Sequence, residues 1–298
     1  MTMWLLVGGD SEVGGATYRQ FRAEGRAAAT TTRRPDRVGA DAIQFDLSDP
    51  LDQWQPPPQT TAVVIFAAVA RLAACQSDPI GSAHINVTQT LKLIERLTAA
   101  GIYVLHLSTN QVFDGLTPHM AADAPTCPVS EYGRQKARAE AGIRELLKRG
   151  APVAVLRIAK VLSPETPLLR DWIAALSKGQ PIRPFTDMVM APTPIDLVAA
   201  AIGHLLQDRA AGFFQVTGPR DVSYADTACH LAERLAADRR LITPVSGETM
   251  NLPLGTLRPH TTLDSTPLRD RYGLAVPDAF AAVDACMAKD LAASARGN

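Results

Sequence analysis

An alternation of short apolar runs with amphipathic stretches limits the fold of this chain more than any other feature. Runs that are apolar on both faces of a strand are typical of a parallel sheet covered by helices on both sides. We therefore expect buried strands at residues 3–7, 27–31, 63–67, 103–108 and 153–158, and a weaker sixth strand at 43–45.

Helical spacing occupies the intervals between these strands, and Leu91, Ile94 and Leu97 share one face of such a stretch. The expected helices lie at 16–24, 82–99 and 130–149. Strands separated by helices predict an α/β fold with a doubly wound parallel sheet and right-handed crossovers. Ligands of such folds bind at the carboxyl ends of the strands.

The second half of the chain changes character, because proline interrupts its apolar segments. We expect helices at 168–177, 195–206 and 223–237, a late strand at 212–217, and a long irregular run at 243–262. We therefore expect residues 163–298 to form mainly a smaller, loop-rich lobe at the edge of the sheet.

Charge and cysteine usage exclude several classes of protein. Thirty basic residues balance thirty acidic ones, so nothing draws the chain as a whole onto nucleic acid or an anionic membrane. The four cysteines form no CxxC pair, which predicts a reducing, cytoplasmic location without a zinc or other metal site. The N-terminus has no basic region before its glycine turn, and no apolar stretch approaches the ~20 residues of a membrane helix, so we expect neither signal peptide nor membrane span.

A glycine loop follows the first expected strand and leads into a helix, the arrangement that binds a pyrophosphate through free N–H groups and the helix dipole. Its candidate cofactor ligands are Gly8, Ser11, Glu12, Val13 and Gly14. Ser11 stands where the pattern would have glycine, so its hydroxyl could face a phosphate while the backbone approaches less closely. An ordinary strand-to-helix turn is the alternative.

The residues after the second and third strands bear on the choice of dinucleotide. Arginines after the second strand suit a ribose 2′-phosphate, so Arg33 and Arg34 favour NADP(H) over NAD(H), unless both are solvated surface residues. Asp46, followed by Leu47, either accepts a hydrogen bond from the adenine amino group or caps a turn.

Tyr132 and Lys136 are four residues apart on an expected helix, so they share a face and can meet one ligand. A neighbouring ammonium favours the phenolate and would lower the pKa of Tyr132 from about 10. The pair follows a buried strand that ends in the hydroxyls of Ser108 and Thr109. Proton transfer at the sheet edge is the chemistry that this set predicts.

These motifs together resemble the extended short-chain dehydrogenases/reductases, and most closely their dTDP-4-dehydrorhamnose reductase branch. The resemblance rests on the glycine loop, Phe45-Asp46-Leu47, Ala67-Ala68, Asp78-Pro79, Asn86-Val87, Ser108-Thr109, Val112-Phe113-Asp114-Gly115, Tyr132…Lys136, Leu156-Arg157, Ala191-Pro192-Thr193, Asp196-Leu197, Arg258-Pro259 and Leu263-Asp264. It implies an NADP-binding Rossmann domain at 1–162, completed by parts of 191–218, and a substrate-binding lobe mainly at 163–298.

The resemblance also implies roles for individual residues. Thr109 would bind the substrate carbonyl, Tyr132 would protonate its oxygen, and Lys136 would hold the nicotinamide ribose. Gly8, Ser11 and Gly14 would line the pyrophosphate, Asp46 the adenine, and Ala67 with Ala68 the adenosine ribose. Contacts to the sugar nucleotide would come from Ser108, Thr109, Asn110 and Arg258.

One departure from the family narrows the chemistry. The family usually has Asp-Tyr after the threonine, whereas this chain has Asn110-Gln111, and neither side chain titrates. That argues against a sugar-nucleotide dehydratase, which needs an acid and a base at this point. We expect an NADPH-dependent reductase of a keto group on a small nucleotide-linked sugar. A nucleotide-sugar epimerase, a non-catalytic regulatory subunit like that of methionine adenosyltransferase, and a homodimeric state stay open.

Overall fold

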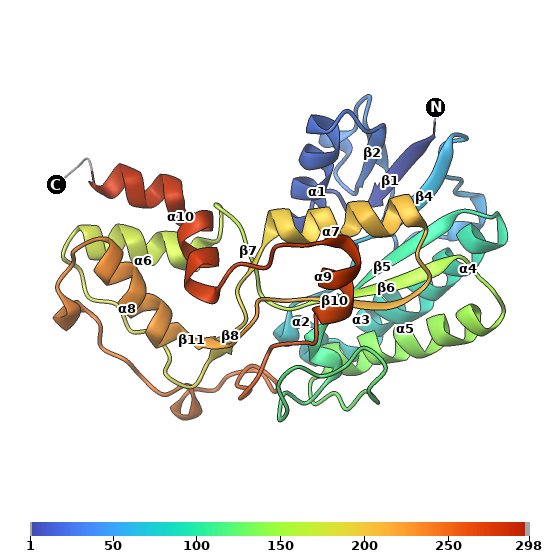
Figure 1. The fold of residues 1–298 in the computed structure, drawn as a ribbon. Helices are drawn as coiled ribbons and strands as arrows, with labels where there is room; N and C mark the ends of the chain where they lie inside the picture. Colours follow the sequence, from blue (N-terminus) through green and yellow to red (C-terminus); the bar gives the residue numbers. More distant parts are fainter. Residues whose placement is uncertain (1, 296–298) are drawn as a thin grey trace.

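The computed structural model describes residues 2–295, and its centre is a seven-stranded parallel sheet (Figure 1). The strands follow the order β10-β6-β5-β4-β1-β2-β3, so the chain starts in the middle and winds outward in both directions. Their bounds are β1 Met3–Val7, β2 Ala28–Thr32, β3 Ala42–Gln44, β4 Thr60–Ile65, β5 Tyr103–Thr109, β6 Val153–Ile158 and β10 Gly212–Val216. The doubly wound α/β fold predicted from the sequence is confirmed.

Helices cover both faces of this sheet. On one face, α1 (Glu12–Ala23) packs against α7 (Ile195–Asp208) over a core that includes Leu6, Leu105 and Leu156. On the other face, α4 (Thr90–Ala99) and α5 (Glu131–Lys148) cover Val63 and Val104. Residues next to each other on a strand enter opposite cores, which is why these strands read as continuously apolar.

The expected helix at 82–99 is divided in the structure. It consists of α3 (Pro79–Ala83), a π-helical stretch (His84–Gln89) and α4, and a short α2 (Leu72–Ser77) precedes them. The π-helical stretch directs Asn86 and Gln89 to backbone groups outside the helix, at Val69 and at Leu47 with Asp49. Widened turns of this kind are frequent at functional sites.

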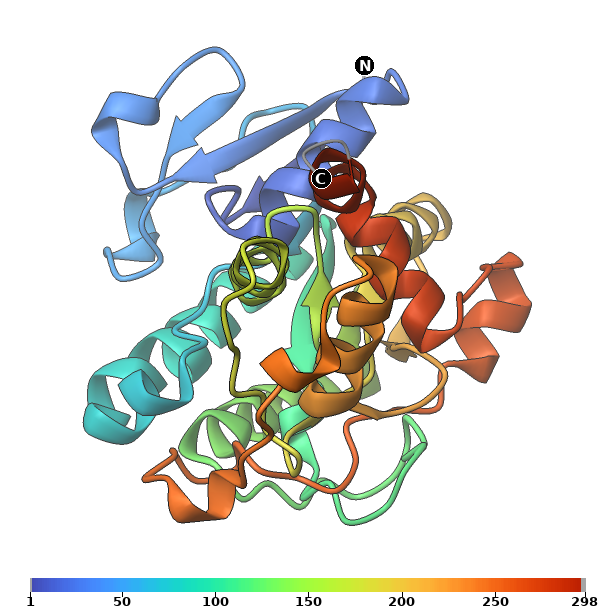
Figure 2. The same cartoon turned by 90° about the vertical axis from the view of Figure 1, so that its left-hand side faces the viewer.

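The second lobe has a helical core of its own, and the sequence predicted two of its three helices, at 168–177 and 223–237. Helices α6 (Pro167–Ser177), α8 (Tyr224–Arg234) and α10 (Ala279–Ala295) lie side by side around Trp172, Leu231 and Val283 (Figures 1 and 2). Two small sheets pair β8 (Val189–Met190) with β11 (Val222–Ser223) and β7 (Val161–Leu162) with β9 (Thr193–Pro194). Helices α9 (Thr266–Tyr272) and α10 were not predicted, whereas residues 243–262 are irregular as expected, apart from one short turn of helix.

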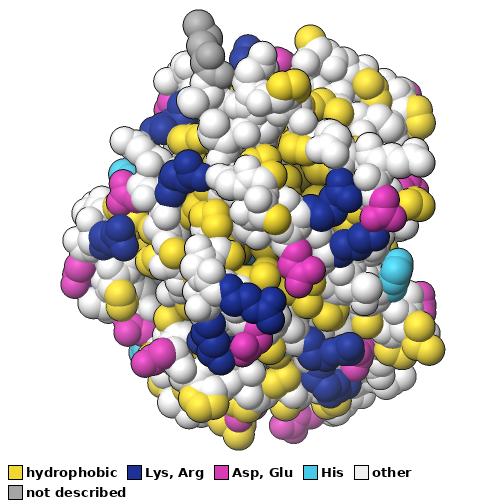
Figure 3. Space-filling view, turned by 90° about the vertical axis from the view of Figure 1, so that its right-hand side faces the viewer, with side chains coloured by type: hydrophobic (Ala, Val, Ile, Leu, Met, Phe, Trp, Pro, Cys, Tyr) yellow, Lys and Arg dark blue, Asp and Glu magenta, His cyan; other side chains and the backbone are white. Residues whose placement is uncertain are grey.

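One face of the molecule carries charged side chains of both signs. On the face in Figure 3, basic and acidic side chains alternate with apolar ones, in keeping with a formal net charge of +0. No helix among residues 2–295 combines the length and the apolar character needed to cross a membrane. The same residues contain no group of three or more His, Cys, Asp or Glu side chains arranged to hold a metal ion.

A buried ion pair joins α5 to the sheet. Glu140 on α5 accepts two hydrogen bonds from Arg157 on β6, the shorter at 2.7 Å, and both side chains are almost fully shielded from solvent. Arg157 also donates to Gln215 on β10, and Ser108 on β5 donates to Glu140 at 2.6 Å. The pair therefore connects one helix with three neighbouring strands.

Removal of Glu140 should strongly destabilise the protein, because Arg157 would keep a buried charge without its partner. We expect Glu140→Ala to lower the free energy of unfolding by about 3–5 kcal/mol in urea titrations. Glu145→Ala on the same helix is the matched control, since its pair with Lys148 is exposed and should contribute little to stability. Equal losses for the two variants would contradict this assignment.

Candidate active site

A cavity of about 830 Å³ lies at the carboxyl ends of β1, β2 and β4. Its wall includes most of the predicted cofactor residues, namely Gly8, Ser11, Arg33, Arg34, Asp46, Leu47, Ala67 and Ala68. It also includes four polar residues that the sequence analysis did not select: Asp10, Thr31, Ser48 and Arg71. Two of these carry a recognisable signal, because Asp10 lies inside the glycine loop and Arg71 follows the end of β4.

The glycine loop needs its glycines for close packing. Gly8 has φ +91°, and a Cβ there would lie 2.7 Å from the backbone nitrogen of Ala67. A Cβ on Gly14 would lie 2.7 Å from the carbonyl oxygen of Gly8. Because neither residue has a side chain, the start of α1 can lie against the ends of β1 and β4, as a phosphate-binding turn requires.

Ser11 caps α1, so its hydroxyl already has partners. It accepts a hydrogen bond from the N–H of Gly14 and donates to the carbonyl of Gly8. The N–H groups of Glu12 and Val13 have no protein partner within the described residues. These two N–H groups and the positive end of the helix dipole are therefore available to an anion such as a pyrophosphate, which fits a dinucleotide.

The two lobes meet beside this helix end. Ser163, in the loop after β7, donates a hydrogen bond to the carboxylate of Glu12. Glu12 was predicted as a cofactor residue; its N–H group fits that prediction, whereas its side chain links α1 to the second lobe. Asp46 likewise caps a turn, because one of its carboxylate oxygens accepts from the N–H and hydroxyl of Ser48.

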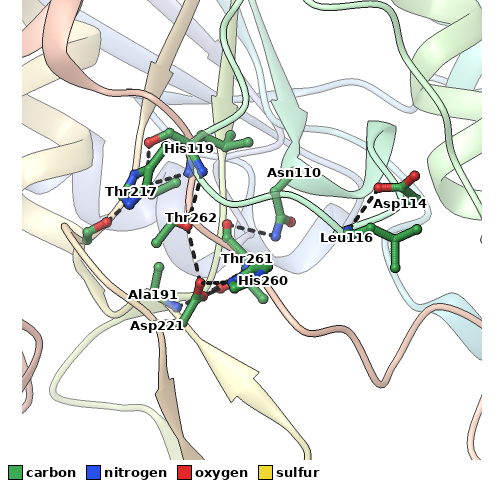
Figure 4. A network of polar contacts seen from close by, with 12 residues as sticks. Asn110, Asp114, Leu116, His119, Ala191, Thr217, Asp221, His260, Thr261 and Thr262 are labelled. Atoms are coloured by element: carbon green, nitrogen blue, oxygen red, sulfur yellow. Dashed lines mark hydrogen bonds and ion pairs between the residues drawn. The ribbon is translucent and has the colours of Figure 1, made fainter.

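The end of β5 carries the predicted catalytic hydroxyl. Thr109 accepts a hydrogen bond from the N–H of Gln111 and donates to the amide oxygen of Asn110. Asn110 donates in turn to the carbonyl of Thr261, in the network that Figure 4 shows around Asp221. Ser108, predicted as a substrate contact, faces the opposite way and its hydroxyl is bonded to Glu140 in the core.

Arg258 packs against the loop that follows β5. Its guanidinium is buried and donates to the carbonyl oxygens of Asn110, Phe113 and Asp114. These contacts give Arg258 the role of fixing the loop after Thr109. A direct contact with a substrate phosphate, as the sequence suggested, would need the guanidinium to leave these partners.

Helix α5 begins close to that same loop. Ser130 caps the helix by accepting from the N–H of Gly133, and its hydroxyl donates to Gln111. A Cβ on Gly133 would lie 2.1 Å from the carbonyl oxygen of Gln111. The first turn of α5 carries Tyr132. It can approach the loop that follows Thr109 only because residue 133 has no side chain.

Tyr132 is only partly exposed, and its electrostatic surroundings keep it protonated. Loss of solvent around the ring, together with the nearby Cys75 thiol, raises the pKa of Tyr132 above its ordinary value. The sequence analysis expected Lys136 to lower this pKa, and that expectation was wrong for this arrangement. The ammonium of Lys136 interacts with β5 instead.

Lys136 is buried between α5 and β5. Its Nζ donates to the carbonyl of Leu107 and lies 2.8 Å from Nε2 of His106. Burial lowers the pKa of Lys136 to about 8, although the carboxylate of Glu140 acts in the opposite direction. Burial also lowers the pKa of His106 well below its ordinary value, with Lys136 adding to the effect, so the imidazole is neutral and can accept from the ammonium.

Asn86 connects the cavity wall with α5. Its amide accepts from the N–H of Val69 and donates to the carbonyl of that residue, which holds the loop after β4. The same amide group donates to Gln135, which precedes Lys136 on α5. Gln135 was missed in the sequence analysis, because no pattern in the sequence indicates which surface a buried amide will meet.

Comparison with known proteins agrees with this fold. A family model described as RmlD substrate binding domain matches residues 1–291. The dTDP-4-dehydrorhamnose reductase of Burkholderia thailandensis is 25% identical, over 95% of this chain and 97% of the relative. The methionine adenosyltransferase 2 subunit beta of Rattus norvegicus is 22% identical, over 89% of this chain and 80% of that protein.

Solved structures show the same architecture. A dTDP-4-dehydrorhamnose reductase ortholog from Clostridium acetobutylicum has a TM-score of 0.80 at 17% identity, covering 97% of this chain and 99% of that one. The dTDP-4-dehydrorhamnose reductase of Bacillus anthracis, in complex with NADP, has a TM-score of 0.79 at 15% identity, with coverages of 97% and 99%.

Fold and site together define the class as NAD(P)-dependent oxidoreductases of the extended short-chain dehydrogenase/reductase type. Within it, the chain belongs to the dTDP-4-dehydrorhamnose reductase-like family, the one described as RmlD substrate binding domain.

Substitution of Gly133 should move the first turn of α5 away from the loop that follows β5. In Gly133→Ala the new methyl group would overlap the carbonyl of Gln111, so α5 or the loop must shift. We expect a loss of kcat of at least about tenfold, since small displacements of catalytic groups are costly. Gly39→Ala, where a Cβ meets open space, is the control; full activity in both variants would be inconsistent with this account.

Lys136 should make stability depend on pH. A fall in its pKa from 10.5 to about 8 on folding corresponds to about 3 kcal/mol against the charged form. Below pH 8 both states are protonated, and between pH 8 and 10.5 the unfolded state binds more protons, so folding becomes more favourable as pH rises.

The test compares urea unfolding of the wild type and Lys136→Met at pH 7 and pH 10. The difference in the free energy of unfolding between the wild type and Lys136→Met should shift by up to about 3 kcal/mol in favour of the wild type at the higher pH. Lys148→Met, which removes an exposed lysine, should show no such shift. A difference between wild type and Lys136→Met that does not change with pH would refute the burial of this charge.

Proposed function

We propose that the protein is an NADPH-dependent reductase of a keto group on a nucleotide-linked sugar. The observation that supports the proposal is the close approach of Gly133, which follows Tyr132 on α5, to Gln111, two residues after Thr109, at the carboxyl edge of the sheet. The names of relatives that act on dTDP-4-dehydrorhamnose support the choice of substrate class.

The proposed cofactor residues are those of the 830 Å³ cavity and the adjoining helix end. The N–H groups of Glu12 and Val13 would hold the pyrophosphate, and Ala67 with Ala68 would lie along the ribose. Arg33 and Arg34 support a preference for NADPH, because both line the cavity beside the end of β2. The bound cofactor supplies the hydride for the reduction.

The protein's own part in the reaction is orientation and proton transfer. Thr109 would hold the carbonyl oxygen, and Tyr132 would donate a proton to that oxygen. The phenol is protonated at neutral pH, as an acid in the direction of reduction must be, while its raised pKa makes it a weaker acid than an ordinary tyrosine. Lys136 would contact the nicotinamide ribose after leaving its position on Leu107 and His106.

The amides that replace the family's Asp-Tyr support a reductase rather than a dehydratase. Asn110 donates to Thr261 and Gln111 donates to Gly255, so both hold the second lobe near the site. Neither group can exchange a proton at neutral pH. Elimination of water would therefore lack its acid and base at this position.

Two other functions of the same fold differ from this proposal in how they use the cofactor. A nucleotide-sugar epimerase would regenerate its cofactor, and a regulatory subunit, favoured by the relative from Rattus norvegicus, would bind it without turnover. Stoichiometric oxidation of NADPH by a 4-keto sugar nucleotide would support the reductase over both. A panel of dTDP-, UDP- and GDP-sugars, read by thermal shift, identifies the nucleotide.

The decisive substitution is Tyr132→Phe. It should lower kcat at least about 100-fold, because the reaction loses its proton donor, while NADPH binding by thermal shift should be nearly unchanged. Tyr272→Phe is the control, since it makes the same substitution on α9, which contributes no residue to the candidate site. Unchanged turnover in Tyr132→Phe would refute the assignment.

A further inference from the structure

Asp10 is a cavity residue that the proposed mechanism does not use. It lies in the glycine loop, and its Oδ2 accepts a hydrogen bond of 2.6 Å from the hydroxyl of Thr32 at the end of β2. It lines the same cavity as Arg33 and Arg34. The carboxylate therefore spans the gap between the first and second strand ends.

The end of β2 is the place where doubly wound folds distinguish the two nicotinamide dinucleotides. An acidic residue there accepts a hydrogen bond from the ribose 2′-hydroxyl of NAD, whereas arginine accommodates the 2′-phosphate of NADP. The sequence at this point is Thr30-Thr31-Thr32-Arg33-Arg34 and contains no acid. Asp10 brings a carboxylate to the same place from another loop, because its oxygen lies against Thr32.

The surroundings keep this carboxylate ionised. Partial burial favours the neutral form, but the hydrogen bond from Thr32 and the charges of Arg34 and Arg37 together outweigh it, so the pKa of Asp10 is lowered. The nearest of these guanidinium atoms, Nη1 of Arg37, lies 3.4 Å from Oδ1. A fixed negative charge thus stands among the cationic groups that would receive a 2′-phosphate.

We propose that Asp10 is a specificity-determining residue that restrains the preference for NADPH and admits NADH to the same site. Its carboxylate accepts a hydrogen bond from the 2′-hydroxyl of NADH and repels the 2′-phosphate of NADPH. Arg33 and Arg34 act in the opposite sense, because they attract the 2′-phosphate. The ratio of the two affinities then reflects a balance between one acid and the arginines. This inference rests on the proposed dinucleotide site.

The test measures the dissociation constants of NADPH and NADH by fluorescence titration, so that no substrate is needed. Asp10→Asn keeps an oxygen that can accept from Thr32 and removes the charge. The affinity ratio in favour of NADPH should rise about tenfold or more, the scale of one charge–charge contact at a partly exposed site. Asp36→Asn is the matched control, because it removes an exposed carboxylate from the neighbouring turn and should leave the ratio unchanged.

Each outcome has one meaning. A ratio for Asp10→Asn within twofold of the wild type overturns the role of Asp10 and leaves the dinucleotide site intact. Failure of the wild-type protein to bind either dinucleotide rejects the proposed function together with this inference. Should Asp10→Asn not fold, Asp10→Ser retains a hydroxyl for Thr32 and is expected to shift the ratio in the same direction.

Discussion

The position of α5 on the sheet is the constraint on which the candidate site depends, and a buried charge pair fixes it. Glu140 and Arg157 would each be very unfavourable in the core alone, so the pair favours the register of the helix that brings them together. Ser108 and Gln215 complete the hydrogen bonding from two further strands. Lys136 lies one turn before Glu140 on this helix, and Tyr132 one turn before that. The buried ion pair therefore determines the positions of these two candidate catalytic side chains.

The site is also held from the side of the second lobe. Arg258 supports the loop after β5 from below, and the amides of Asn110 and Gln111 bond to backbone carbonyls of the segment around it. On the nucleotide side, Ser163 is bonded to Glu12 at the start of α1. Contacts from the segment around Arg258 and from the loop after β7 thus reach the end of β5 and the start of α1, respectively.

Sequence patterns predicted the fold well where one physical cause dominates. Apolar runs placed β1 and β6 within their observed bounds, and the glycine loop was found because close packing leaves no alternative to glycine at Gly8 and Gly14. What the patterns could not indicate is which partner a polar group meets in space. Ser108 and Arg258 have side chains suited to substrate binding, yet their partners are a carboxylate and carbonyl groups distant in sequence.

The two ionisable groups of α5 illustrate the same limit and also indicate a direction for the chemistry. Spacing on a helix predicts that Tyr132 and Lys136 are close, but their protonation depends on burial, which raises the pKa of one and lowers that of the other. The phenol then holds its proton at neutral pH, while the ammonium is stabilised by neutral acceptors, Leu107 and His106, rather than by a phenolate. The phenol thus starts in the protonation state that reduction requires, whereas oxidation of an alcohol would first require the phenolate, which burial disfavours.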